Sequence, residues 1–518
     1  MVQTKIQNPI LPGFNPDPNI LKVGDSYYLA VSSFEWLPGI RIYTSENLVN
    51  WQHHTDILTD QVNLQGNPKD CSIWAPQLSY YDDQFYLTYT DVKNTTRPFK
   101  DCHNFLMTAP SIDGPWSEPI YMTSSGFDPS LFHDEDGRKW YLNEIWDYRM
   151  TTSNKSAGIV MQEYDARTKQ MVGPVHKIFD GTELAKTEAS HIYRHGEYYY
   201  LITAEGGTGS GHSVTVCRSK NITGPYELDP NYPMMTASDK PESLLKNTGH
   251  GSLVEGINGK WYMAYLTTRP LQGKAAILGR ETAIQEVVWT DDGWLRLANQ
   301  TTAPEAVTMI ETKEPVVQEI HTKFHDDFTS PLKKEWNTRR LMPSEDWCDL
   351  KSRPGYLRMI SGESPQSNFD QHMLAVRQKD FVFEAKTSIE FSPKTFNQMA
   401  GLFLYLNEQN YIYCYQTWDE EKGQVLRLMK CQEGTHTLLP ERLSISQKEL
   451  TLKVSVDHEK GSFYQLTKSE QWEKIGPTFD LMFLAGGFTG NFIGIGVQDL
   501  DKKAGCYADF AYFDYQPK

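Results

Sequence analysis

Five segments in the first three hundred residues repeat one pattern of apolar and polar positions. Each has a turn-like lead-in, one Ile or Leu, a polar turn rich in Gly or Asp, and then a run of aromatic residues. The first runs from Asp17 to Leu29 and the last from His250 to Met263. The aligned apolar positions are 20, 78, 131, 192 and 253, which gives steps of 58, 53, 61 and 61 residues. The pattern indicates a tandem repeat.

Each repeat is predicted to be a hairpin followed by two further strands, which makes one blade of a β-propeller. Five blades fit within residues 1–300, and no sustained helical spacing of apolar residues competes with them. The first strand of a blade lies nearest the propeller axis, so the lead-ins should converge at one end of the central channel. The converging residues are Asp17, Trp74, Asp128, Glu188 and His250. They predict one pocket with three acids, an indole and an imidazole.

A different pattern begins after this repeat. Residues 301–322 are expected to be a linker, and residues 323–518 show no five-fold repeat. Apolar and polar residues alternate there with a period of two, and turn signals separate the segments. The chain is therefore predicted to be all-β, with a five-bladed propeller followed by a β-sandwich. The strands expected in the sandwich are Val382–Phe391, Asn410–Thr417, Val425–Lys430, Leu450–Val456 and Ala508–Phe513.

Composition excludes several classes of partner. The net charge is −16 without a basic cluster, which argues against nucleic acid and anionic membrane surfaces. No apolar run is long enough to span a membrane. The seven cysteines form no CxxC pair or Cys/His cluster, and no secretory signal opens the chain, so a cytoplasmic protein is expected. Aromatic residues make up 12% of the chain and could form walls on which sugars stack.

The predicted acids suit glycoside hydrolysis, which uses two carboxyl groups. One stays ionised as base or nucleophile, and the other stays protonated and donates to the leaving oxygen. A third carboxylate nearby would raise the donor's pKa by repulsion. Carboxyl groups on different blades are expected to lie across the channel, which favours the inverting separation of roughly 6.5–9.5 Å.

Eight short motifs follow one another along the first 300 residues, and together they resemble glycoside hydrolase family 43, in particular its two-domain β-xylosidases. The sequence departs from the family pattern at Ser190, where Pro or Gly is frequent. The motifs are Gly13–Pro18, Ser33–Trp36, Trp74–Gln77, Phe127–Phe132, Thr187–His191, Glu205–Thr208 with Gly211-His212, Thr248–Gly251 and Leu278–Thr282.

The resemblance implies a role for each acid. Asp17 would be the general base that activates water, and Glu188 the general acid that protonates the glycosidic oxygen. Asp128 would raise the pKa of Glu188 and orient it. Arg280 would reach the sugar hydroxyls and the charges of Asp17 and Asp128, keeping both carboxylates ionised.

The resemblance also implies the walls of the pocket. The terminal sugar would lie among Phe34, Trp74, Phe127 and Trp146, with Thr208 and His250 nearby. Some family members hold Ca²⁺ beside the residue matching His250 and others need no metal. No cofactor is therefore expected to be required, and a purely structural histidine is the alternative.

By the same resemblance the sandwich is lectin-like. Its segment Phe488–Gly494 is expected to lend Phe492 to the active-site rim, which would close the channel into a pocket. A pocket admits only a chain end and so implies exo-action. A separate carbohydrate-binding module is the alternative for this domain.

These expectations describe an exo-glycosidase that releases xylose from the non-reducing ends of β-1,4-xylooligosaccharides with inversion, with side activity on α-L-arabinofuranosides. A homo-oligomer, either dimer or tetramer, is expected. One alternative is an enzyme that is mainly an α-L-arabinofuranosidase. The other is a sugar-binding propeller without catalysis, which would have little use for a proton donor such as Glu188.

Overall fold

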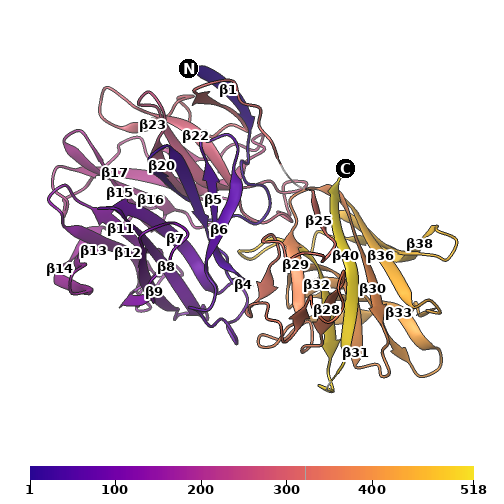
Figure 1. The fold of residues 1–518 in the computed structure, drawn as a ribbon. Coiled ribbons are helices and arrows are strands. Elements are labelled where there is room, and N and C mark those ends of the chain that lie inside the picture. Colours follow the sequence, from indigo (N-terminus) through magenta and orange to yellow (C-terminus); the bar gives the residue numbers. More distant parts are fainter. Residues whose placement is uncertain (321–322, 504) are drawn as a thin grey trace.

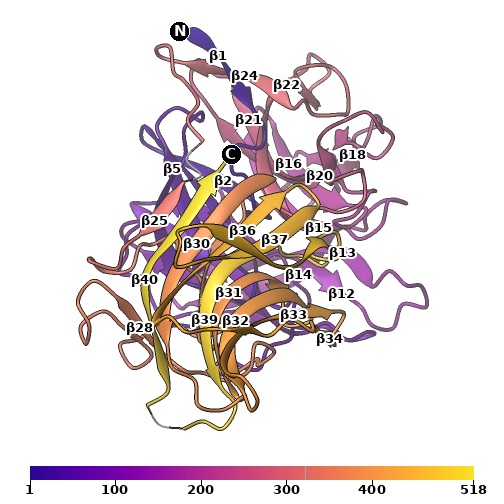
Figure 2. The same ribbon diagram turned by 90° about the vertical axis from the view of Figure 1, so that its right-hand side faces the viewer.

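In the computed structural model, which describes residues 1–320, 323–503 and 505–518, every regular element is a β-strand. Figure 1 shows two parts side by side, a propeller coloured indigo to magenta and a sandwich coloured orange to yellow. Figure 2 looks from the sandwich side and shows its curved sheets in front of the propeller. The predicted fold class is confirmed. Within the described residues, no helix has the length and apolar character that a membrane crossing requires.

Each repeat folds as an antiparallel sheet whose four main strands follow one another in chain order. The blades are β2 (Asn19–Val23), β3 (Ser26–Val31), β5 (Gly39–Ser45) and β6 (Gln52–Leu58); β7 (Ser72–Tyr81), β8 (Gln84–Asn94), β9 (Asp101–Ala109) and β10 (Ile120–Thr123); β11 (Ser130–His133), β12 (Lys139–Trp146), β13 (Ser156–Asp165) and β14 (Gln170–Phe179); β15 (Glu188–His195), β16 (Tyr198–Glu205), β17 (Ser213–Ser219) and β18 (Glu227–Leu228), with β19 (Met235–Thr236) also paired to β17; and β20 (Lys246–Glu255), β21 (Trp261–Thr268), β22 (Glu281–Trp289) and β23 (Leu295–Leu297).

The first strands of the blades form the inner ring of the propeller. β2, β7, β11, β15 and β20 each contact the first strands of the two neighbouring blades. The five aligned apolar residues at positions 20, 78, 131, 192 and 253 are all buried, because each points between blades. The lead-ins therefore converge at one end of the channel, as the repeat predicts.

The expected linker contains a strand. β24 (Val307–Thr312) pairs antiparallel with β1 (Val2–Gln7), so this part of 301–322 is bound to the start of the chain. The Asn8 amide extends the closure by donating to the carbonyl oxygens of Ile284 and Glu305 at 2.8 and 3.1 Å. The segment between the two domains therefore carries one strand, which pairs with the edge that β1 offers.

The second part consists of two sheets with an apolar core between them. All five predicted strands are found, as β30, β32, β33, β36 and β40. One sheet holds β25 (Phe324–Asp326), β27 (Cys348–Asp349), β28 (Leu357–Ile360), β30 (Val382–Phe391), β36 (Glu449–Asp457), β37 (Lys460–Leu466), β38 (Trp472–Asp480) and β40 (Tyr507–Pro517), and the other holds β29 (Met373–Arg377), β31 (Gln398–Asn407), β32 (Asn410–Asp419), β33 (Gly423–Gln432), β34 (Thr435–Leu438), β35 (Leu443–Ser444) and β39 (Phe492–Asp499).

Main-chain pairing and buried rings join the two parts. β4 (Trp36–Leu37) of the propeller pairs with β26 (Thr338–Arg339) of the sandwich. Beside this pair, the rings of Trp36 and Phe492 stack with centroids 3.6 Å apart. Both side chains are fully buried. The sandwich is therefore packed firmly enough to supply a residue to a site on the propeller.

Candidate active site

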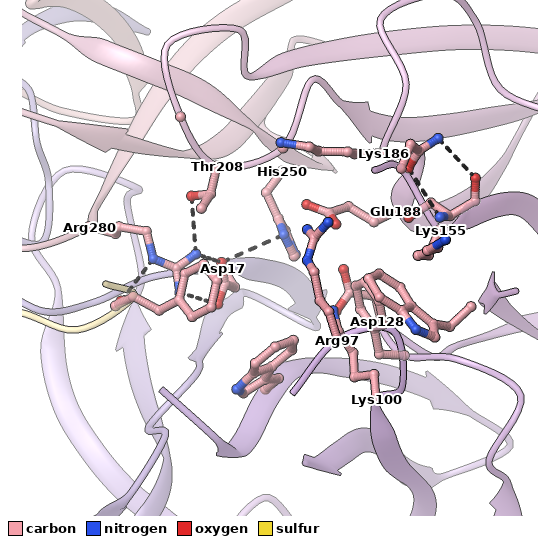
Figure 3. Close-up of a pocket in the computed structure, with 18 of the residues that line it drawn as sticks. Asp17, Arg97, Lys100, Asp128, Lys155, Lys186, Glu188, Thr208, His250 and Arg280 are labelled. Carbon is pink, nitrogen blue, oxygen red and sulfur yellow. Dashed lines mark hydrogen bonds and ion pairs between the residues drawn. The ribbon is translucent and has the colours of Figure 1, made fainter. Parts of the chain in front are cut away.

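A cavity of about 230 Å³ opens where the five lead-ins meet (Figure 3). Among its lining residues are Asp17, Trp74, Asp128, Glu188 and His250, one from each blade. This volume is below the range of drug-sized ligand pockets and suits a single small sugar. The structure thus brings together the residues that the repeat selects.

The same backbone conformation recurs at every lead-in. Asp17, Ala75, Asp128, Ala189 and His250 all adopt left-handed backbone, with φ of 54°, 41°, 54°, 51° and 52°. Each lies three residues before the aligned apolar position of its blade. Non-glycine residues rarely adopt this conformation, which costs roughly 1–3 kcal/mol and is concentrated at functional sites. The repeated turn aims one side chain per blade into the cavity.

Asp17 is held as a carboxylate. Arg280 donates from Nη1 to Oδ1 at 2.6 Å and from Nη2 to Oδ2 at 3.2 Å, and the Ser32 hydroxyl donates to Oδ2 at 2.7 Å. Burial alone would raise the pKa of Asp17, but Arg280 and these hydrogen bonds hold that pKa below its usual range. Asp17 is therefore ionised and suited to accept a proton.

Glu188, the first residue of β15, is held in the opposite state. Burial, aided by the charge of Asp17, raises the pKa of Glu188 to about 7, although Lys100, Arg280 and Lys186 oppose the rise. A carboxyl group with this pKa keeps its proton in about half of the molecules at pH 7 and in most of them below that, so it can donate. The site therefore pairs an ionised acid on one blade with a protonated acid on another.

Asp128 lies behind Glu188 and fixes its backbone. Oδ2 of Asp128 accepts the N–H of Ala189, the residue after Glu188, at 3.1 Å. Burial raises the pKa of Asp128 well above its usual range, and repulsion from Glu188 adds to it. Arg280 bonds to Asp17 and makes no hydrogen bond to Asp128 in the described structure. The expectation that Arg280 keeps Asp128 ionised is therefore wrong, since the guanidinium is committed to Asp17.

A fourth acid, Glu144 of β12, was missed from the sequence. It is fully buried, and burial raises its pKa to about 8. Its charge also contributes to the raised pKa of Asp128. The sequence signal was weak because Glu144 lies inside a strand and outside the repeated lead-in.

The apolar walls form one continuous chain of rings. Phe34 packs on Trp74 and Trp74 on Phe127, each pair with centroids 5.7 Å apart, and Phe127 lies 6.2 Å from Trp146. All four line the cavity. Such rings offer flat faces to the apolar side of a sugar.

The aromatic residue that the sandwich lends to the site is Phe488. Its ring lies 5.9 Å from Phe34 and 5.5 Å from Trp74, and it lines the cavity. Phe492 does not line it, because it is the first residue of β39 and stacks on Trp36 in the domain interface. The expectation for Phe492 was wrong by four residues. The ring that faces the cavity is that of Phe488, which lies in the loop before β39.

Thr208 and His250 lie beside Arg280 and Asp17, and both line the cavity. Nη1 of Arg280 lies 3.4 Å from the Thr208 hydroxyl, and Nδ1 of His250 lies 3.7 Å from Asp17 Oδ1. Burial lowers the pKa of His250, so its imidazole is neutral.

These side chains do not fit a metal site. No three His, Cys, Asp or Glu side chains in the described residues are grouped as metal ligands. The carboxylate nearest His250 belongs to Asp17, and the Arg280 guanidinium already occupies it. A calcium ion, which prefers several oxygen ligands, would have to compete with that guanidinium.

Four cations at the cavity were also missed. They are Arg97 and Lys100 between β8 and β9, Lys155 before β13, and Lys186 before β15. They lie in loops of different length without a common position in the repeat, so the period gave no signal for them.

Comparison with known proteins gives a consistent match. The model of glycosyl hydrolases family 43 matches residues 6–295, and that of the beta xylosidase C-terminal concanavalin A-like domain matches residues 325–516. A beta-xylosidase of Bacillus subtilis is 39% identical, covering 99% of this chain and 100% of the relative. A xylosidase/arabinosidase 43B of Humicola insolens is 40% identical over 99% of this chain and 98% of the relative.

Among solved structures, the xylan beta-1,4-xylosidase of Bacillus halodurans C-125 superimposes with a TM-score of 0.95. It is 45% identical to this chain, and the match covers 99% of this chain and 100% of that one.

Proposed function

Because the chain belongs to glycosyl hydrolase family 43, we propose that it releases single xylose units from the non-reducing ends of β-1,4-xylooligosaccharides with inversion of the anomeric carbon. The chain is a glycoside hydrolase. The observation that carries the proposal is the opposite shift of the pKa values of Asp17 and Glu188 in a cavity whose volume suits one sugar.

Each acid has one task in the reaction. Glu188 gives its proton to the glycosidic oxygen, and the bond from that oxygen to the anomeric carbon breaks. Asp17 takes a proton from a water molecule as the water oxygen bonds to the opposite face of the same carbon. The products are xylose and a shortened oligosaccharide, with one proton lost by Glu188 and one gained by Asp17.

Phe488 supports exo-action. Its ring comes from the sandwich and stands against Phe34 and Trp74, so the end of the channel is walled on that side. We therefore expect a chain to enter by its end, with the terminal sugar in the cavity and the leaving part outside.

Two variants test the roles. Asp17→Ala and Glu188→Ala should each lose about 10²–10⁴-fold in rate on xylobiose. An aryl xyloside whose leaving group needs no protonation should restore Glu188→Ala and leave Asp17→Ala inactive. Equal restoration of both would contradict the assignment. NMR should show α-xylose as the first product, and β-xylose would contradict inversion.

Activity on α-L-arabinofuranosides is the second candidate. The Humicola insolens relative bears both activities in its name, and a relative from Bacteroides ovatus, 30% identical, is named a non-reducing end alpha-L-arabinofuranosidase. Rates on aryl β-xyloside and aryl α-arabinofuranoside, measured side by side, decide which is dominant. A faster arabinofuranoside reaction would reverse the order proposed here.

We also propose that the reaction needs no metal ion, since Arg280 already neutralises the carboxylate nearest His250. Activity should survive treatment with a chelator, and a loss restored by calcium would contradict the proposal. A cytoplasmic location and a homo-oligomer remain parts of the proposal. All seven cysteines are free, which supports a reducing compartment.

A further inference from the structure

Four cations stand around the mouth of the cavity of a protein whose net charge is −16. Arg97 and Lys186 are exposed, and Lys100 and Lys155 are half-buried. The acids of the cavity lie deeper, since Asp17 and Asp128 are only 5% and 7% exposed. The mouth is thus basic and the floor acidic.

None of these four cations forms an ion pair with a carboxylate of the described structure. The Lys100 ammonium is held over the rings of Phe127 and Trp146, 3.9 and 4.1 Å from their centroids. Arg97 donates from Nη1 to the carbonyl of Ser153 at 2.5 Å.

The other two cations have different surroundings. Lys155 donates to the carbonyl of Met150. Lys186 lies against the backbone of Gly207. A Cβ atom placed on that glycine would be 3.0 Å from the Nζ atom of Lys186. Protein groups therefore hold Arg97, Lys100 and Lys155, and none of the four cations is paired with a carboxylate of the described residues.

The position of these cations relative to the reaction is defined. Figure 3 shows Arg97, Lys100 and Lys155 beside Glu188 and Asp128, on the side away from Arg280, whereas the Lys186 side chain passes Glu188 and points toward Thr208. Lys100 and Lys186 both lower the pKa of Glu188, which places their charges near its carboxyl group. Glu188 protonates the leaving oxygen in the proposed reaction, so the cations surround the leaving group.

We propose that this basic mouth binds a carboxylate on the leaving part of the substrate. The preferred substrates of the enzyme are then xylooligosaccharides that carry a uronic or aldonic acid next to the scissile bond. An anionic leaving group would supply the counter-charge that the mouth lacks, and Arg97 offers the planar donor pair that suits a carboxylate. The proposal rests on the proposed xylosidase activity, which it refines.

Two matched compounds isolate the charge. Xylobionate carries a carboxylate at the oxidised end of xylobiose, and xylobiitol carries a neutral alcohol at the same carbon of the same open chain. The ratio of kcat/KM for xylobionate to that for xylobiitol should be about tenfold at low ionic strength. It should fall severalfold at about 0.3 M salt, because exposed charges are screened.

Lys100→Met tests the side chain at the centre of the mouth. The variant keeps an apolar chain against Phe127 and Trp146 and removes the charge, so the ratio should fall toward one. Lys139→Met is the matched control. Lys139 also lies over a ring, since its Nζ is 4.5 Å from the centroid of the Tyr81 ring. It is the first residue of β12, whereas Trp146 at the cavity is the last, so Lys139 lies at the opposite end of that strand. The control should keep the wild-type ratio.

The outcomes separate this inference from the proposed function. One outcome is that xylobiitol is turned over, the kcat/KM ratio of xylobionate to xylobiitol is near one, and neither salt nor Lys100→Met changes that ratio. This outcome would overturn the inference and leave the proposed function standing. Absence of turnover of xylobiitol and aryl xyloside would overturn the proposed function. In that case, titration of both compounds into the Glu188→Gln protein measures the same preference without catalysis, and equal affinities would overturn the inference.

Discussion

Asp70 of the propeller accepts the main-chain N–H of Phe488 from the sandwich, with 2.8 Å between Oδ1 and N. On the other side, Nε of Arg280 donates to the carbonyl oxygen of Phe488 at 2.9 Å. The same guanidinium holds Asp17. One residue of the sandwich is thus fixed by two groups of the propeller, and its docking is coupled to the position of the proposed base.

The first prediction concerns Asp70. Asp70→Ala leaves the N–H of Phe488 without its acceptor, so the ring should lose its fixed place and kcat/KM should fall about tenfold, chiefly through KM. Asp70→Asn keeps an oxygen acceptor and should restore most of the loss. Steady-state kinetics on xylobiose measure both variants, with Asp60→Ala at an exposed site as control. An Asn variant as poor as the Ala variant would show that the hydrogen bond is not what matters.

The second prediction is the pH dependence of kcat/KM. Glu188 must be protonated, so activity should decline as pH rises through its pKa of about 7. Asp17 must be ionised, and because its pKa is lowered, activity should persist below the usual range of aspartate titration. Lys100→Met removes a charge that lowers the pKa of Glu188, so the alkaline limb should move to higher pH. An unchanged limb in this variant, with Lys139→Met as control, would contradict the assignment of that limb to Glu188.

The third prediction concerns stability. Glu35 is fully buried between Arg339 and Arg340, 3.9 Å from each, and burial raises its pKa from 4.5 to about 7. A raised pKa means that the folded state holds the proton more tightly, so stability is fullest below about pH 4.5 and is lost as pH rises to about 7.

Glu35→Gln cannot lose this proton. The free energy of unfolding of the variant, relative to the natural protein, should therefore increase by up to about 3 kcal/mol between roughly pH 5 and pH 8. Denaturant unfolding at the two pH values measures it. A constant difference between the two proteins would contradict the raised pKa of Glu35.

The fourth prediction uses the repeated left-handed turn. Ala75 has a φ of 41°, and its N–H donates to the Ser32 hydroxyl at 2.7 Å, a bond that glycine keeps. Ala75→Gly removes from the folded state a steric cost of roughly 1–2 kcal/mol. It also raises the conformational entropy of the unfolded chain, which cancels part of that gain in stability. Thermal unfolding should show a gain of up to about 1 kcal/mol. Ala283→Gly, in the extended strand β22, should lower stability, and a loss in both variants would contradict the strain.

The period of the chain was enough to predict the blades and the acids. Asp17, Asp128 and His250 occupy equivalent places three residues before the aligned apolar residue, and Trp74 and Glu188 occupy the place before that. Residues at equivalent positions of a repeat occupy equivalent places in their blades, so the place of one residue predicts the places of the others.

The residues missed lack this support. Lys100 lies in a loop peculiar to its blade, and Glu144 is one of many strand residues. Phe488 and Phe492 stand in one short segment, and only the start of β39 decides which ring faces the cavity. Arg280 was expected to serve two acids, and only the folded geometry shows that its donors are already used by Asp17 and the carbonyl of Phe488.

The pairing of β1 with β24 sets where the chain can be divided. A cut after residue 300 would remove β24 and leave β1 with an unpaired edge. The propeller would then lose the strand pairing that joins the start of the chain to the segment after the last blade. A cut after residue 312 would keep this pairing but discard Phe488, and the cavity would open on the side that this ring walls. Neither shortened chain would keep both the closed ring and the closed pocket, so the enzyme is one functional unit built from two folds.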